Sequence, residues 1–108
     1  MIARVWHGYT DHQNAQAYET LLKEEIFVAI ANRGIAGFRR IQLLRRALDS
    51  EVEFVTIMDF DSLEAVREFA GEDYETAVVP ANARALLARF DARSQHYELI
   101  GSRPATNT

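Results

Sequence analysis

Histidines are the side chains of this chain best suited to proton transfer near neutral pH, and two of the three fall in predicted strands. His7 belongs to the first predicted strand and His96 to the last, and we expect these strands to be neighbours in one sheet. We predict a catalytic role for both, because an imidazole can take or give the proton that a hydroquinone oxidation or an isomerisation requires. The alternative is that one or both hold a backbone carbonyl at a subunit interface or a rim. His12 lies in the first turn of a predicted helix, where we expect it to be solvated.

Tyr74 and Arg84 are the other polar side chains to which we assign roles. We predict that the Tyr74 phenol is a catalytic group that orients a substrate carbonyl. We predict that Arg84 binds substrate by neutralising a carboxylate or an enolate. The alternatives are that Tyr74 is a packing lid and that Arg84 pairs with Glu75 or Asp91.

Strand alternation places Trp6 and His7 on opposite faces of the first strand, so only one of them can face a pocket. Arg4 shares the side of Trp6, and Tyr9 shares the side of His7. We predict that the His7 side faces the pocket.

Several classes of site are absent from the sequence. It has no cysteine, which excludes disulfides and thiolate metal ligands, and no His-x-His or His-x-x-x-His spacing, so we predict no metal. No nucleophile elbow, P-loop or dinucleotide-binding glycine pattern occurs, which sets aside serine hydrolases, kinases and nicotinamide-dependent enzymes. We predict that the protein uses no cofactor.

Composition points to one globular domain over residues 1–100, followed by a flexible tail over 101–108. The 108 residues are 48% hydrophobic with a net charge of −4, which argues against nucleic-acid binding. No signal peptide or membrane-length apolar run is visible, so we expect a cytoplasmic protein that does not enter a membrane. We expect the basic pairs Arg39–Arg40 and Arg45–Arg46 to form a solvated strand edge or a salt-bridged dimer rim.

Periodicity predicts the elements of the first half. Residues 2–9 read as a strand, and Thr10 with Gln13 has the spacing of a capping box that would open a helix. That helix carries an apolar stripe, and Gly34 is suited to a left-handed cap at its end; the stripe is formed by Tyr18, Leu22, Ile26 and Ile30.

The second half completes a strand–helix–strand–strand–helix–strand order. Residues 35–46 and 51–60 read as a hairpin, and Asp61 with Glu64 predicts the start of a helix that ends at Gly71. We expect helical turns over 73–79 and 81–87, and a last strand over 92–100. Because 51–60 is apolar on both faces and helices can cover only one, we predict a homodimer.

This order predicts an α+β ferredoxin-like fold with the antiparallel sheet order 4-1-3-2. Up to Ile100 the chain resembles the antibiotic biosynthesis monooxygenase family of dimeric α/β-barrel proteins. The resemblance is clearest in two segments, the stretch from Phe54 to Ser62 and the block from Gly71 to Tyr74.

The resemblance also shows where the chain departs from its relatives. The cofactor-free monooxygenases of polycyclic phenols carry an Asn, a Trp and a Tyr at the places of Thr56, Phe60 and Val66. The haem-degrading relatives carry a pocket Trp and an iron-ligating His at the places of Phe69 and Val79. Neither mechanism therefore transfers intact, and haem ligation of that kind is not expected.

What the resemblance implies is a pocket between the sheet and the helices. Strand alternation would turn four side chains of one strand into it, and a helix would close it; the predicted substrate-binding residues are Phe54, Thr56, Met58, Phe60 and Phe69, with Val66 beside them. The alternative is that these residues are only the hydrophobic core.

The resemblance implies a cofactor-independent monooxygenase acting on a small aromatic or quinone-like molecule. One alternative is an isomerase of the same superfamily. Another is a non-catalytic dimeric barrel that binds a small molecule or is related to a stress response. The missing amide and indole favour the binding protein, whereas the histidines and tyrosines favour the enzyme.

Overall fold

A computed structural model describes residues 1–106 of the chain. Its regular elements are β1 (Ile2–Thr10), α1 (Ala15–Leu21), η1 (Leu22–Ile26), α2 (Phe27–Asn32), β2 (Phe38–Ala47), β3 (Val52–Phe60), α3 (Leu63–Ala70), α4 (Ala81–Arg84), β4 (Arg89–Phe90) and β5 (Gln95–Glu98). The α1, η1 and α2 segments form one continuous helix whose middle turn, η1, is a π-helix. Within the described residues no helix has both the length and the apolar character needed to cross a membrane.

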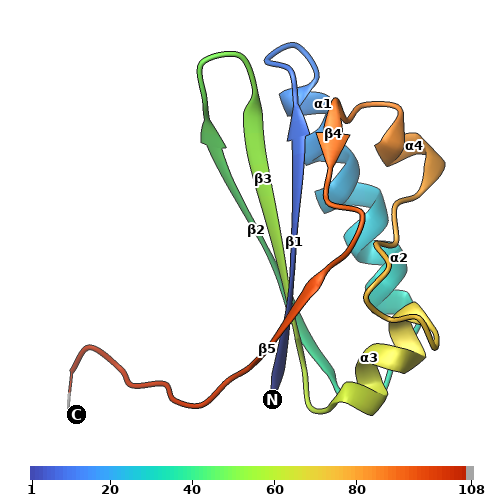
Figure 1. Cartoon of the computed structure of the whole chain (residues 1–108), viewed down its shortest axis with the longest axis vertical. Coiled ribbons are helices and arrows are strands. Elements are labelled where there is room, and N and C mark those ends of the chain that lie inside the picture. Colours follow the sequence, from blue (N-terminus) through green and yellow to red (C-terminus); the bar gives the residue numbers. More distant parts are fainter. Residues whose placement is uncertain (107–108) are drawn as a thin grey trace.

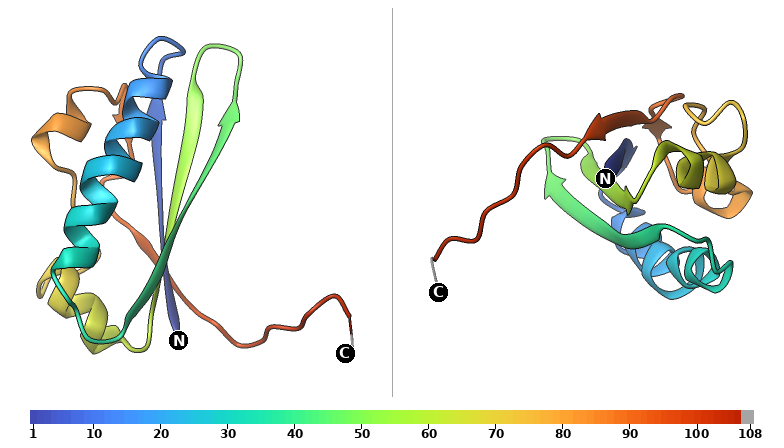
Figure 2. Two further views of the ribbon diagram at one scale, coloured as in Figure 1. Left: turned by 180° about the vertical axis from the view of Figure 1, so that it is seen from behind. Right: turned by 90° about the horizontal axis from the view of Figure 1, so that it is seen from below.

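The strands form one antiparallel sheet in the order β2-β3-β1-β4, and β5 also pairs with β1. This is the predicted ferredoxin-like order, but the predicted last strand over 92–100 is only the shorter β5, and β4 was not predicted. The helices lie on one face of the sheet and leave the other face uncovered (Figures 1 and 2). The structure therefore confirms the α+β fold as a two-layer arrangement, and pairing into a dimeric barrel stays a prediction.

The core fills the space between the sheet and the helix layer. One buried cluster joins Tyr18 of α1 to Phe54 of β3, whose rings meet edge to face at 4.9 Å. A second cluster joins Phe60 of β3 to Phe69 of α3, with ring centroids 5.8 Å apart. These two clusters hold the long helix and α3 at opposite ends of the same sheet face.

The ends of the helices differ partly from the predicted capping residues. The Thr10–Gln13 capping box is wrong: the Thr10 hydroxyl donates to the Asp11 carbonyl, and an Asp11 carboxylate oxygen accepts from the Asn14 backbone N–H at 2.7 Å. Asp61 does not cap α3; the Ser62 hydroxyl accepts from the backbone N–H of Ala65 instead. The cap of α3 is thus one residue nearer to its helix than predicted, whereas Asp11 closes the turn before α1, whose N-cap residue Asn14 makes no side-chain capping hydrogen bond.

Two glycines end the helices as predicted. Gly34 follows α2 with φ +63°, and Gly71 follows α3 with φ +89°. Both lie in the left-handed region, where a side chain would be strained. The long helix therefore ends here, and the chain turns back to form β2.

The segment 72–80 is irregular, so the predicted helical turn over 73–79 is wrong. Its backbone pairs with the chain before β5: Ala77 N–H donates to the Ala92 carbonyl, and Thr76 forms a bridge with Arg93. These long-range hydrogen bonds outweigh the local helical preference of the segment. Pro80 then precedes the single-turn helix α4, which is shorter than the predicted 81–87.

The basic pairs of β2 form ion pairs within the chain. Their partners come from α1, β3 and the turn after β3; the pairs are Arg39 with Asp61, Arg40 with Asp59, Arg45 with Glu19 and Arg46 with Glu53. All four arginines are exposed. The predicted solvated strand edge is confirmed, and the alternative, a salt-bridged dimer rim, stays a prediction.

Residues 101–106, within the predicted tail, are exposed and form no helix or strand. They run away from the body of the protein (Figure 1). The last two residues of the predicted tail, 107–108, lie outside the described part of the chain.

Candidate functional site

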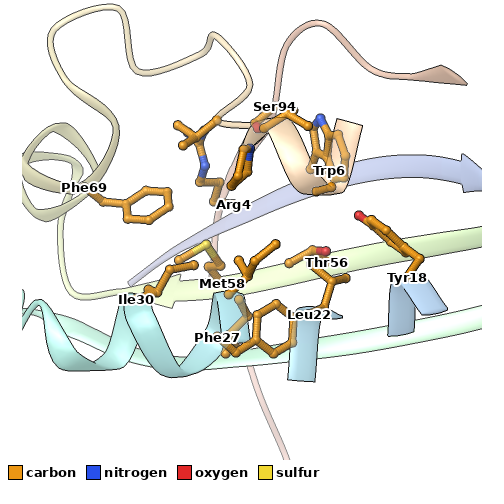
Figure 3. Close-up of a pocket in the computed structure, with 16 residues that line it drawn as sticks. Arg4, Trp6, Tyr18, Leu22, Phe27, Ile30, Thr56, Met58, Phe69 and Ser94 are labelled. Carbon is orange, nitrogen blue, oxygen red and sulfur yellow. The ribbon is translucent and has the colours of Figure 1, made fainter. Parts of the chain in front are cut away.

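A cavity of about 70 Å³ lies between the sheet and the helix layer (Figure 3). It touches β1, β2 and β3, the long helix, α3 and the segments that flank α4 and β5; the lining residues are Arg4, Trp6, Tyr18, Leu22, Ile26, Phe27, Ile30, Ile41, Thr56, Met58, Phe69, Val78, Val79, Pro80, Ala83 and Ser94. Most of these side chains are apolar, and the polar ones are few. This is the composition of a site for a mostly apolar small molecule.

Strand alternation explains which side chains of the sheet reach the cavity. Trp6 of β1 lies opposite Thr56 of β3, so both point to the helix side. Arg4 and Met58, two residues away on each strand, point the same way. Gly8 lets the Trp6 ring lie along β1, because a Cβ at this position would stand only 2.9 Å from two indole carbons. The Trp6 indole N–H donates to the Asp91 carbonyl at 2.7 Å and so fixes the ring.

The π-helical turn sets the helical wall. The Phe27 backbone N–H donates to the carbonyl of Leu22, five residues earlier, so these two side chains lie on the same side of the helix. Both line the cavity together with Ile26 and Ile30. The predicted stripe of the long helix is thereby widened by Phe27, which a regular helix would turn away.

A wider depression of about 500 Å³ adjoins the cavity. Both are lined by Ile26, Ile30, Phe69, Val78 and Pro80. Arg33, Glu25 and Asn82 add polar side chains only to the outer depression. A ligand larger than a single ring would therefore extend from the cavity into this depression.

Arg4 is the most unusual side chain of the cavity, because it is a cation that is only 4% exposed. One of its Nη1 hydrogens goes to the Tyr74 carbonyl, and Nη2 donates to the Thr76 carbonyl at 3.3 Å. Its guanidinium carbon stands 5.5 Å from the centre of the Phe69 ring. Burial lowers the pKa of Arg4 to about 10, so it is still protonated at neutral pH. Arg4 thus carries a positive charge into an apolar site and ties the segment 72–80 to β1.

His96 lies beside Arg4, and its Nε2 is 3.0 Å from the Arg4 Nη1. Since a guanidinium can only donate, Nε2 is the unprotonated nitrogen and the imidazole is neutral. Burial and then the charge of Arg4 lower the pKa of His96. The Tyr74 ring packs edge to face on the imidazole at 5.1 Å. His96 does not itself line the cavity, and its lone pair is directed at Arg4, so it could accept a proton only once Arg4 turns to another partner.

We expect the folded protein to lose stability in mild acid because of His96. The pKa of His96 is lowered in the folded state, so the unfolded chain takes up this proton at a higher pH than the folded chain does. The contribution is present above about pH 6.5 and falls away as the pH drops through the lower folded-state pKa. Melting temperatures of the wild type should therefore decrease between pH 7 and pH 5 more than those of a His96→Gln variant. The exposed His12 offers the control, and a His12→Gln variant that behaved like His96→Gln would contradict this assignment.

Tyr18 supplies a second polar group to the cavity. Its side chain is 1% exposed, and its hydroxyl makes no hydrogen bond to the described residues. Figure 3 shows this hydroxyl pointing toward Trp6. Burial raises the pKa of Tyr18, so the hydroxyl keeps its proton and is a hydrogen-bond donor at neutral pH.

Of the predicted substrate-binding residues, Thr56, Met58 and Phe69 line the cavity. Phe54 and Phe60 are fully buried in the two core clusters that flank it. Both point to the same side of the sheet as Thr56, in agreement with the predicted alternation. A contact between either phenylalanine and a ligand stays a prediction.

The predicted catalytic histidines lie on opposite faces of the sheet. Trp6 and Arg4 line the cavity, so the prediction that the His7 side faces it is wrong. The His7 Nδ1 lies 3.1 Å from a carboxylate oxygen of Asp91 on the uncovered face. Strand alternation in β1 allowed either the Trp6 side or the His7 side to face the pocket, and the position of the helices decides for the Trp6 side. Catalysis by His7 stays a prediction, to be tested separately from the cavity.

Tyr74 and Arg84 occupy different surroundings. Tyr74 packs on His96, and its backbone carbonyl accepts a hydrogen bond from Arg4, but Tyr74 lines neither the cavity nor the outer depression. Arg84 is exposed on α4, with its guanidinium carbon 5.3 Å from the centre of the Phe90 ring. Arg84 lines neither the cavity nor the outer depression, and its role in substrate binding stays a prediction.

Sequence reasoning gave no role to Arg4, Tyr18 or Ser94. The signal for Arg4 was its place in an otherwise apolar strand, on the parity of Trp6. Tyr18 was assigned only to the apolar stripe of the helix, although its hydroxyl reaches the cavity. Among residues 1–106 no three histidine or acidic side chains gather as a metal site would require.

Comparisons with known proteins show the fold. No protein-family model matches the sequence, and no curated protein does. The structure matches a proposed antibiotic biosynthesis monooxygenase from Bacillus cereus with a TM-score of 0.65 and 15% identity, over 96% of this chain and 97% of that one. It matches the haem degrader MhuD from Mycobacterium tuberculosis, solved with two haems in its active site, with a TM-score of 0.58 and 17% identity over 96% and 100% of the two chains. It also matches SnoaB, a cofactor-independent oxygenase from Streptomyces nogalater, with a TM-score of 0.55 and 20% identity over 98% of each chain. The sequence-based resemblance is thus confirmed at the level of the fold.

Proposed function

We propose, from this shared fold and from the cavity between its layers, that the protein is a cofactor-independent monooxygenase of a small aromatic or quinone-like molecule. The observation that supports the proposal best is an apolar, ring-lined cavity whose buried cation, Arg4, contacts a neutral histidine, His96. An electron-rich phenolate can react with oxygen without flavin or metal, provided that the site binds it and removes its proton.

His96 is the proposed proton acceptor. A phenol bound in the cavity would pass its hydroxyl proton to Nε2 while Arg4 releases that nitrogen. Tyr74, which packs on the imidazole, would hold the ring in place, and its phenol would orient the substrate. In the overall reaction a ring CH₂ and O₂ become a ring C=O and H₂O, so the substrate loses the four electrons that the oxygen molecule gains.

Oxygen uptake tests this function. The metal-stripped protein is mixed with a panel of hydroquinones and anthrone-like phenols, and uptake is compared with the uncatalysed background. Uptake that is lost in His96→Ala and kept in His12→Ala supports the proposal. Uptake that survives in His96→Ala removes the histidine from the mechanism, and uptake at background level across the panel removes the oxygenase.

The second candidate is a non-catalytic protein, or an isomerase, that uses the same cavity. One observation favours it: the lone pair of the His96 Nε2 is already occupied by Arg4. Binding of an aromatic ligand without oxygen uptake would select this candidate.

We propose that two copies of the chain pair through the uncovered face of the sheet. This face carries exposed apolar side chains, among them Leu44 of β2 and Tyr97 of β5, which are 49% and 57% exposed. Val55 and Ile57 of β3 lie between them and are only half-buried. Helices would normally cover such a face, so a second copy is the proposed cover.

A Leu44→Lys substitution is expected to separate the two copies. Burying an ammonium group in the interface is costly, whereas the monomer tolerates it at a site that is 49% exposed. Light scattering after gel filtration should give twice the chain mass of 12.3 kDa for the wild type and close to 12.3 kDa for the variant. Val28→Lys is the matched control, because Val28 is equally exposed at 49% but lies on α2. A wild type that elutes as a monomer would contradict the proposed pairing.

A further inference from the structure

The charge of Arg4 has no counter-ion in the part of the chain that the structure describes. Six exposed arginines each meet a carboxylate; they are Arg39, Arg40, Arg45, Arg46, Arg89 and Arg93. Arg4 is far more buried than these, yet its partners are two backbone carbonyls and a neutral imidazole. A buried charge without an opposite charge is costly, and such a feature is expected where a ligand supplies the missing charge.

Arg4 also has hydrogen-bond donors that no described residue accepts from. A guanidinium has five N–H groups, and three of them face the Tyr74 carbonyl, the Thr76 carbonyl and the His96 Nε2. The Nε–H and one Nη2–H remain without a partner among residues 1–106. These two hydrogens can serve the oxygen atoms of a carboxylate or a phenolate.

The walls next to Arg4 fix the shape of the ligand. Aromatic rings of Trp6, Phe27 and Phe69 border the cavity, and the outer depression continues past Phe69. The inner space of about 70 Å³ is small, whereas the adjoining 500 Å³ gives room for further rings. This combination suits an aromatic group that reaches from the inner space into the depression.

We infer that Arg4 is the anion-binding residue of this site: a carboxylate, phenolate or enolate oxygen of an aromatic ligand binds to its guanidinium, with the rest of the ligand running outward past Phe69. The inference deepens the proposed function, because it names the charge and the anchoring residue of that same site. Binding of the anion would draw the guanidinium from the His96 Nε2, which leaves this nitrogen free to accept a proton. Arg4 is therefore assigned as a binding residue for the ligand.

Anthraquinone derivatives test the inference without turnover, since their central ring is already oxidised. Calorimetry compares anthraquinone-2-carboxylate with the uncharged anthraquinone-2-carboxamide at pH 7. We expect the carboxylate to bind about tenfold tighter or better, the ratio typical of a charge-assisted hydrogen bond. A third probe, 2-hydroxyanthraquinone, changes colour when it ionises, so its absorbance in the complex shows whether the site selects a phenolate.

Two arginine variants and a matched control identify the anchor. Arg4→Met should bring the ratio of carboxylate to carboxamide affinity close to one, and Arg4→Lys should restore part of it. Arg67→Met is the control: Arg67 is an exposed arginine of α3 whose guanidinium carbon lies 5.4 Å from the Tyr74 ring, yet it lines neither the cavity nor the outer depression. We expect this control to keep the wild-type ratio. If Arg4→Met fails to fold, the ratio of carboxylate to carboxamide affinity is compared between Arg4→Lys and the wild type, and this comparison still tests the role of Arg4.

The outcomes separate this inference from the proposed function. Equal affinity of the wild type for carboxylate and carboxamide, with no phenolate colour in the complex, would overturn the inference. An unchanged ratio in Arg4→Met, or a ratio lost in Arg67→Met, would also overturn it. Anion selectivity that depends on Arg4 in a protein without oxygen uptake would support the inference and remove the oxygenase.

Discussion

Replacing Phe60 with alanine is expected to lower the free energy of unfolding by about 3–5 kcal/mol. The Phe60 side chain is fully buried, and its ring packs between Phe38 at 5.5 Å and Phe69 at 5.8 Å. Removing it would leave a hole between β3 and α3 that neither neighbour can fill. Urea unfolding followed by circular dichroism measures the loss, which is large against the roughly 5–15 kcal/mol that stabilises most domains.

Phe38→Ala is the control for this prediction. Phe38 packs on the other side of Phe60 but is only half-buried, so its loss should cost clearly less. The comparison also decides whether Phe60 is a residue of the hydrophobic core or a substrate-binding residue, the two roles considered from the sequence. A Phe60→Ala variant of nearly wild-type stability that no longer bound an aromatic ligand would contradict the core role and place Phe60 in the binding surface.

Enlarging Thr56 is expected to close the cavity while the fold survives. Thr56 lies on β3 between Trp6 and the long helix, and its half-buried side chain lines the cavity. A Thr56→Leu variant should bind anthraquinone-2-carboxylate about tenfold more weakly or worse, the effect typical of one or two methylene groups in a fitted pocket. Calorimetry measures the affinity, and thermal melting checks that the variant is folded.

Val55→Leu is the matched control for the cavity. Val55 is the adjacent residue and is also half-buried, but it points to the uncovered face of the sheet. We expect its affinity for the ligand to be unchanged. Equal losses in the two variants would mean that the effect is a general disturbance of β3, and no loss in Thr56→Leu would place the ligand elsewhere.

The arrangement of the sheet was predictable because it depends on patterns that repeat. The apolar parities of 51–60 indicated a central strand, and β3 does lie between β1 and β2. Gly34 and Gly71 marked the helix ends, where a positive φ leaves little choice of residue. The capping residues were harder, because neighbouring side chains such as Asp61 and Ser62 can both serve and only the path of the chain selects one.

The site was only partly predictable. The family resemblance implied a pocket at Thr56 and Phe69, strand alternation added Met58, and all three do line the cavity. The contact between Arg4 and His96 joins residues 92 positions apart and depends on the irregular segment 72–80, for which local propensity gave the wrong structure. Which face of β1 lines the cavity likewise depends on where the helices pack, and strand alternation alone does not predict that.

Trp6 provides the most direct measurement of the central claim, that the cavity between the sheet and the helices is the functional site. It is the only tryptophan of the chain and it lines the cavity, so its fluorescence reports what enters there. In a titration with anthraquinone-2-carboxylate, we predict saturable quenching at one ligand per chain, weakened alike by Thr56→Leu and Arg4→Met. Calorimetric binding that leaves the Trp6 fluorescence unchanged would contradict the account, because the ligand would then lie outside the cavity.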